Sequence, residues 1–225
     1  MNIPYKLSTV LGNICFKLFG DWHVSGKPFV PPFGPLIVVS NHISNADPPV
    51  LISSIPRQMA FLAKDELFNK PILNAFFKSL GAHPLSRSGP DITAIRWASR
   101  MIETDRAVLL FPEGTRSATG ALQRGMPGSA YLALQTQAPI LPVAITGTES
   151  IPGFWRVAFP LTKIRVTIGS PFTLPEIEGR PSKDILQSLS DMIMMRIADL
   201  LPSNYRGYYA SNATVLPGDA RTTSQ

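Results

Sequence analysis

Short apolar runs that alternate with segments of helical spacing constrain the fold of this chain more than any other feature. The apolar runs, which we interpret as buried strands, lie at 36–40, 59–63, 107–111, 140–145 and 164–168. Helices are expected at 48–55, 71–80, 91–103, 126–136 and 183–201. Parallel strands need a crossover connection, usually a helix, so this alternation favours a parallel sheet. We therefore predict an α/β fold with a mainly parallel sheet flanked by helices.

The bulk properties limit the classes of partner and site. The 225 residues carry a net charge of +6 with a pI near 9.7, which suits an anionic partner. No basic run with interleaved aromatic residues and no nucleic-acid motif is present, so we expect no nucleic-acid partner. Cys15 is the only cysteine, and His23, His42 and His83 are scattered, so we expect no metal site. No apolar run reaches the roughly 18 residues that a membrane-spanning helix requires.

The first polar block follows the apolar run at 36–39 and contains a histidine and an aspartate, His42 and Asp47. Catalytic side chains of α/β proteins cluster beyond the carboxyl ends of strands, so the position is suited to chemistry. Pro48 and Pro49 indicate that a helix begins there, which leaves 42–47 as a turn able to fold Asp47 back to His42. The histidine could then act as a general base oriented by the carboxylate. Alternatively, Asp47 only caps the following helix.

The second polar block, Phe111–Ser117, follows the apolar run at 107–110. Gly114 permits a tight turn, and the planar guanidinium of Arg116 is suited to phosphate. Glu113 is better placed to orient neighbouring groups than to contact an anion. Alternatively, Arg116 is an ordinary solvated arginine on a surface turn.

The two blocks together resemble the glycerolipid acyltransferase family, whose best-known members acylate lysophosphatidic acid. The family's first block is matched by Asn41-His42, followed after four residues by Asp47. Its third block is matched by Phe111–Ser117. The resemblance implies that His42 is the base and Asp47 its orienting group. It also implies that Glu113, Gly114, Thr115 and Arg116 bind substrate, and that Asn41 supports the site.

Two weaker matches extend the resemblance. Arg87 stands where the family's second block has an arginine that binds the acceptor phosphate, although a solvated loop residue is the alternative. Pro142 lies in 139–145, which resembles the fourth block, and we assign that segment to shaping the acyl pocket.

The function that the resemblance implies is acyl transfer from acyl-CoA or acyl carrier protein to 1-acyl-glycerol-3-phosphate, which gives phosphatidic acid. It implies no cofactor or metal, and a peripheral or monotopic position on the cytoplasmic face of the cell membrane. Two alternatives stay open. One is a related acyltransferase that acts on another lysolipid or lyso-aminolipid. The other is a non-catalytic membrane-binding protein with the same fold.

We expect the chain to be divided into three parts. Residues 1–30 are expected to form an amphipathic membrane-associating segment, 31–202 the acyltransferase domain, and 203–225 a loosely ordered tail without periodicity. The first segment contains a helix at 3–19, with Ile3, Leu7, Val10, Leu11, Ile14 and Leu18 at helical spacing. This helix either packs on the domain or lies on the cytoplasmic leaflet with Lys6 and Lys17 at the headgroups.

Overall fold

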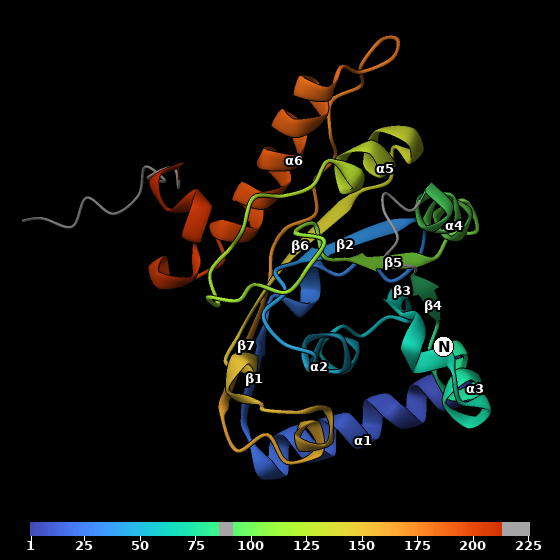
Figure 1. The fold of residues 1–225 in the computed structure, drawn as a ribbon, viewed down its shortest axis with the longest axis vertical. Helices are drawn as coiled ribbons and strands as arrows, with labels where there is room; N and C mark the ends of the chain where they lie inside the picture. The colour runs from blue at the N-terminus through green and yellow to red at the C-terminus, as the bar shows by residue number, and fades with distance from the viewer. Residues whose placement is uncertain (86–91, 213–225) are drawn as a thin grey trace, which may run out of the picture.

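The computed structural model, which describes residues 1–85 and 92–212, contains a seven-stranded sheet in the order β1-β7-β6-β2-β5-β3-β4 (Figure 1). The strands are β1 (Asp21–Ser25), β2 (Leu36–Ser40), β3 (Met59–Lys64), β4 (Ala82–Leu85), β5 (Ala107–Leu110), β6 (Ile140–Thr146) and β7 (Lys163–Ile168). Only β6 and β7 pair in antiparallel fashion, and the other neighbours are parallel. The predicted mainly parallel α/β sheet is therefore confirmed.

Helices cover both faces of the sheet (Figure 1). One face carries α1 (Ile3–Phe19), α2 (Asp47–Ser54) and α3 (Pro71–Ser79), and the other carries α4 (Ile92–Glu103), α5 (Gly128–Thr136) and α6 (Lys183–Ala198). The fully buried strand β2 serves both cores, because Leu36 and Val38 point to the first and Ile37 and Val39 to the second. Short 3-10 segments are η1 (Lys27–Phe29), η2 (Asp65–Phe68), η3 (Thr148–Ser150), η4 (Phe154–Ala158), η5 (Ser203–Tyr205) and η6 (Gly207–Asn212).

The sheet is wider than predicted, because β1 and β4 form its two edges. Residues of β1 alternate between exposed and half-buried, and the strand begins with a charged residue, Asp21. The four residues of β4 include Pro84, which cannot donate a ladder hydrogen bond and is tolerated at an edge. Short edge strands with little apolar character leave a weak pattern in the sequence.

The first helix is packed on the domain, but not through its predicted apolar stripe. Tyr5 and Phe16 are buried in the core, and the Tyr5 hydroxyl donates to the carbonyl of Arg57 at 3.2 Å. The stripe itself faces outward, with Ile3 82%, Leu7 67% and Leu18 69% exposed. No helix within the described residues is both long and apolar enough to cross a membrane. One side of α1 is thus part of the fold, and its most apolar side is left uncovered.

Residues 203–212 do not form a loosely ordered tail, and that part of the prediction is wrong. Tyr209 is 1% exposed, and its hydroxyl donates to Asp191 at 2.7 Å and accepts from the N–H of Gly125 at 3.0 Å. Leu122 makes two further backbone bonds to this segment, with Tyr205 and Tyr208. The polar composition of the segment hid the tyrosines that anchor it. Residues 213–225 lie outside the described part of the chain.

Because β7 runs antiparallel to β6, distant parts of the chain meet at one end of the sheet. Thr146, at the end of β6, is in register with Arg165 near the start of β7, and Asp21 at the start of β1 is in register with Lys163. The starts of β1 and β7 therefore lie at the end of the sheet where the parallel strands β2, β5 and β6 finish. The last turn of α1, which leads directly into β1, lies at this same end, together with the polar blocks.

Candidate active site

His42 and Asp47 form a close pair in the turn between β2 and α2. Nδ1 of His42 lies 2.7 Å from Oδ2 of Asp47, and the same oxygen accepts the N–H groups of Ile43 and Ser44 at 2.7 and 2.8 Å. Asp47 is the first residue of α2, and the preceding Ala46 makes no capping bond from its side chain. The carboxylate therefore turns back over 42–44 instead of capping the helix.

The protonation pattern of the imidazole follows from this pairing. Because Oδ2 of Asp47 accepts, the proton of a neutral His42 resides on Nδ1 and the lone pair on Nε2. The Asp47 side chain is fully buried, whereas that of His42 is 18% exposed. The imidazole also stacks on the ring of Phe111, with centroids 4.1 Å apart. A ring fixed in this way can take a proton from a substrate hydroxyl at Nε2.

The backbone of His42 is held by the second polar block. Its N–H donates to Oε1 of Glu113 at 2.8 Å, and its carbonyl accepts from the N–H of Ser117 at 2.7 Å. The other carboxylate oxygen of Glu113 accepts from the N–H of Gln123 at 2.9 Å. Burial raises the pKa of Glu113 to about 7, and the two N–H donors offset part of that rise. Glu113 thus links three segments and is a positioning residue of the site.

The turn between Glu113 and Ser117 faces solvent. Gly114 has a φ of 70°, a conformation that favours glycine, and its N–H donates to the carbonyl of Phe111 at 3.0 Å. Gly114, Thr115 and Arg116 are all exposed. The turn therefore presents a guanidinium to solvent, in the segment that fixes the histidine backbone.

The remaining predicted site residues have different surroundings. Asn41 is 2% exposed, and its amide forms two 2.8 Å bonds with the backbone N–H and carbonyl of Ile145, which fasten the first block to the end of β6. Pro142 is buried within β6, in register with Val39. Arg87 lies outside the described residues.

Two contributing residues were not singled out from the sequence, Ser117 and Thr148. The Thr148 hydroxyl donates to Oδ1 of Asp47 at 2.5 Å, and both residues are fully buried. A separation of 101 residues and the absence of a motif around Thr148 leave no local signal. The available clue is that Thr148 closely follows β6, a parallel neighbour of β2, so both strands end on the same side of the sheet as His42 and Asp47.

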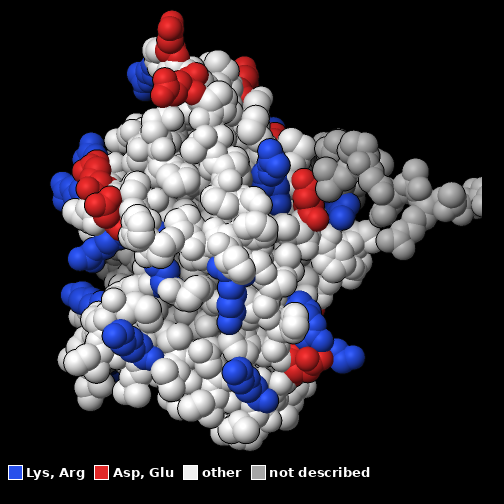
Figure 2. All heavy atoms as spheres, turned by 180° about the vertical axis from the view of Figure 1, so that it is seen from behind, with Lys and Arg blue, Asp and Glu red and all other residues white. Residues whose placement is uncertain are grey.

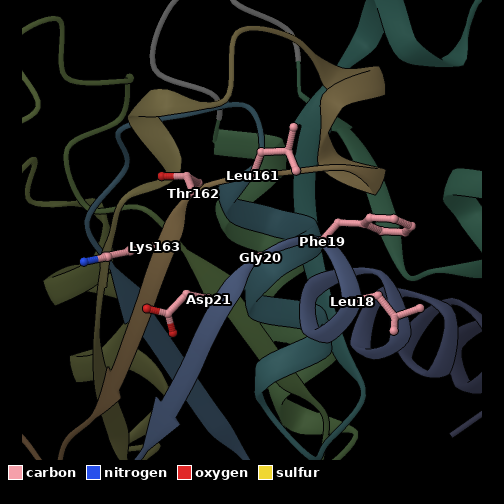
Figure 3. A pocket seen from close by; sticks show the side chains of 7 residues that line it. All are labelled: Leu18, Phe19, Gly20, Asp21, Leu161, Thr162 and Lys163. Atoms are coloured by element: carbon pink, nitrogen blue, oxygen red, sulfur yellow. The ribbon is translucent and has the colours of Figure 1, made fainter.

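A shallow hollow of about 370 Å³ lies beside the end of α1, at the starts of β1 and β7 (Figure 3). It is lined by Leu18, Phe19, Gly20, Asp21, Leu161, Thr162 and Lys163. Leu18 and Leu161 are 69% and 67% exposed, so its rim is apolar beside the charged Asp21 and Lys163. It contains none of the candidate catalytic residues and is distinct from the turn that holds His42.

The arrangement of His42 and Asp47 can support general-base catalysis. Within 1–85 and 92–212, no three His, Cys, Asp or Glu side chains are grouped to hold a metal ion. The polar groups of the site are instead matched to one another, with a buried carboxylate behind an accessible imidazole. This arrangement suits the removal of a proton from an alcohol that then attacks an acyl carbon.

Comparisons with known proteins relate this chain to acyltransferases. The 1-acyl-sn-glycerol-3-phosphate acyltransferase of Bacillus subtilis is 26% identical over 198 residues, covering 87% of this chain and 96% of the relative. The enzyme of the same name from Streptococcus pneumoniae is 28% identical over 144 residues, and the match covers only 52% of its length. The solved structure of the 1-acyl-sn-glycerophosphate (LPA) acyltransferase PlsC from Thermotoga maritima is similar, with a TM-score of 0.67 and 29% identity. That match covers 84% of this chain and 76% of the solved one.

The family model described as Acyltransferase matches residues 21–146, which include both polar blocks and six of the seven strands. This match spans more than half of the chain and ends at the last residue of β6. The His42–Asp47 pair lies within the matched segment, and the match shows that the chain belongs to the acyltransferase family and is an acyltransferase.

Proposed function

We propose that this acyltransferase moves a fatty acyl group from a thioester to the free hydroxyl of 1-acyl-glycerol-3-phosphate and so forms phosphatidic acid. The observation that carries the proposal is the His42–Asp47 pair, joined at 2.7 Å and accessible from the imidazole side. The names of the Bacillus subtilis and Thermotoga maritima relatives support the choice of acceptor.

The reaction is a direct transfer in which His42 handles the proton. Nε2 takes the proton of the acceptor hydroxyl as its oxygen forms a bond to the thioester carbonyl carbon. The carbon–sulfur bond then breaks, and the departing thiolate receives the proton from the imidazolium. Asp47 stabilises the imidazolium while it exists, because its Oδ2 faces Nδ1. The carrier of the thioester is coenzyme A or acyl carrier protein, and the step requires no cofactor or metal.

The acceptor phosphate is assigned to the exposed turn at 114–116. A guanidinium can bind two phosphate oxygens in parallel, which fixes the orientation of the lipid headgroup as well as its charge. Arg116 is exposed, three residues from Glu113, which holds the His42 backbone. Arg87 is proposed as a second ligand of the phosphate.

A membrane surface is the proposed location, and α1 is the element that would contact it. Its uncovered stripe includes Leu7, Leu11 and Ile14, which are 67%, 59% and 49% exposed. Basic side chains outnumber acidic ones at the lower end of the molecule, where α1 and α3 lie (Figures 1 and 2). An apolar stripe with lysines beside it is typical of helices that lie in an anionic interface. Because both acyl carriers are intracellular, the proposed face is the cytoplasmic one.

The test is an assay with purified protein, labelled acyl-CoA or acyl carrier protein, and 1-acyl-glycerol-3-phosphate in vesicles. Formation of labelled phosphatidic acid with release of one thiol per acyl group is expected. The His42→Ala variant, shown folded by circular dichroism, is the control and should form product at least about 100-fold more slowly than the wild type.

The alternatives predict different products in the same assay. Transfer to a lyso-aminolipid or another lysolipid, but not to 1-acyl-glycerol-3-phosphate, would overturn the proposed acceptor. Vesicle binding without transfer to any lysolipid would indicate a non-catalytic membrane-binding protein.

A further inference from the structure

Both carboxylate oxygens of Asp47 accept hydrogen bonds, and the donor to one of them, Thr148, lies 101 residues away in the sequence. Oδ2 accepts from His42 Nδ1 and from the N–H groups of Ile43 and Ser44. Those three donors all belong to the turn that Asp47 itself closes. Oδ1 accepts from the Thr148 hydroxyl at 2.5 Å, which is the contact that ties the carboxylate to the rest of the sheet.

The backbone around Thr148 is built to hold that hydroxyl in place. Gly147 has a φ of 89°, and a Cβ there would lie 1.8 Å from the carbonyl oxygen of Lys163, so the approach requires glycine. The N–H of Ile151 donates to the carbonyl of Thr148 at 3.0 Å and closes the η3 turn. The neighbouring Glu149 accepts from the Tyr205 hydroxyl at 2.5 Å, which ties the turn to the C-terminal segment.

We propose that Thr148 is a positioning residue for the transfer reaction, which holds the Asp47 carboxylate in the plane that serves Nδ1 of His42. Without the hydroxyl, Oδ1 is a buried acceptor that has lost its Thr148 donor, so rotation of the carboxylate toward other donors is no longer opposed. Rotation would move Oδ2 away from the imidazole and leave Nδ1 poorly oriented. Thr148 acts through Asp47 and does not contact the substrate.

The proposal rests on the proposed function, and the variants are chosen to isolate the hydroxyl. Thr148→Ala and Thr148→Ser differ from each other only by a hydroxyl group. Thr148→Val replaces the hydroxyl by a methyl and keeps the branched shape. The matched control is Thr136→Val. The Thr136 hydroxyl donates to the carbonyl of Leu132 at the end of α5, near the start of β6 and so at the opposite end of the strands from the site.

Steady-state kinetics on vesicle-borne acceptor give the first readout. Thr148→Val and Thr148→Ala should lower kcat by about 10- to 100-fold, the factor that corresponds to one hydrogen bond to a charged group. The KM for the acceptor should be unchanged, because Thr148 contacts no substrate. Thr148→Ser and Thr136→Val should retain kcat near that of the wild type.

Proton NMR gives a readout that does not depend on turnover. An imidazole N–H bonded to a carboxylate gives a low-field resonance, which the His42→Ala variant identifies by its loss. The resonance should move or broaden in Thr148→Ala and stay in place in Thr148→Ser. An unchanged resonance together with unchanged kcat in Thr148→Ala would overturn the proposal. Equal losses in Thr148→Ala and Thr148→Ser would overturn it too, because the methyl group would then be what matters. If the wild type transfers no acyl group, the proposed function fails while the NMR comparison still tests the role of Thr148.

Discussion

Oε1 of Glu113 accepts a hydrogen bond from the backbone N–H of His42 at 2.8 Å, across a sequence separation of 71 residues. This bond joins the two polar blocks, which follow the neighbouring parallel strands β2 and β5. The position of the imidazole therefore depends on a buried carboxyl group whose pKa is raised to about 7.

That raised pKa predicts a dependence of folding stability on pH. The carboxyl of Glu113 ionises near its ordinary value of 4.5 in the unfolded chain and only near 7 in the fold. Between these values the native state binds more protons, so its stability falls as pH rises from about 4.5 to about 7. Relative to Glu113→Gln, the wild type should lose up to about 3 kcal/mol over this range. Urea unfolding of both proteins at pH 5 and pH 8 measures the difference. A difference between the two proteins that does not vary with pH would contradict the raised pKa.

Removal of the base is expected to slow turnover by orders of magnitude and to preserve the fold. His42→Ala should lower kcat by about 10²- to 10⁴-fold, the usual contribution of a general base. Asp47→Asn should also be severe, because the Oδ2 position must receive the Nδ1 proton and two N–H groups. Labelled acyl transfer by each variant, with near-ultraviolet circular dichroism as the folding control, is the measurement. Near-normal transfer by folded His42→Ala would rule out this mechanism.

The exposed arginine of the second block should discriminate between acceptors. Arg116→Ala is expected to raise the KM for 1-acyl-glycerol-3-phosphate and to affect a monoacylglycerol acceptor, which has no phosphate, much less. Arg116→Lys should restore only part of the loss, since an ammonium group cannot provide the planar fork. The exposed Arg100 on α4 provides a matched control, as Arg100→Ala. Equal losses on both acceptors would show that Arg116 serves the donor or the fold.

Membrane association should depend on the uncovered stripe of α1 and not on the helix as a whole. Deletion of 1–20 removes the buried Tyr5 and Phe16, so it would unfold the domain and test nothing about lipid. The double change Leu7→Glu and Leu11→Glu alters only exposed positions and should reduce sedimentation with anionic vesicles. Its melting temperature should match the wild type, because exposed substitutions usually cost within about 0.5 kcal/mol.

Ile185→Glu is the control for the membrane experiment, since Ile185 is 42% exposed on α6, across the sheet from α1. Sedimentation of this variant should equal that of the wild type. If the double variant of α1 sediments as well as the control, the stripe has another role.

Arg57 should prove to be a major contributor to stability. Its guanidinium donates to the carbonyls of Pro31, Phe33 and Gly34, in the proline-rich approach to β2, and to that of Asp105 before β5. Arg57→Met should lower the free energy of unfolding by at least about 2 kcal/mol, because several of these acceptors lose a charged donor. Chemical denaturation beside the exposed Arg100→Met variant measures the effect. Equal stability of the two variants would refute it.

The fold was largely predictable from the sequence, and the exceptions have identifiable physical causes. Fully buried strands such as β2 leave continuous apolar runs, whereas the edge strand β4 contains Pro84 and is only four residues long. The pair His42 and Asp47 was predictable because its geometry is set by a local turn followed by two prolines. Thr148 was not, since its contact with Asp47 depends on where β6 ends relative to β2, which only the assembled sheet determines.

The anchored segment at 203–212 has a consequence for how the enzyme matures. Translation delivers the seven strands and the His42–Asp47 turn well before it delivers Tyr205 and Tyr209. Until that segment docks, Leu122 lacks its two backbone partners and the N–H of Gly125 lacks the Tyr209 hydroxyl, in the loop whose Gln123 N–H donates to Glu113. The loop that carries Gln123 can therefore gain its last contacts only after all seven strands have been synthesised, which makes the C-terminal segment the final piece of the support behind Glu113.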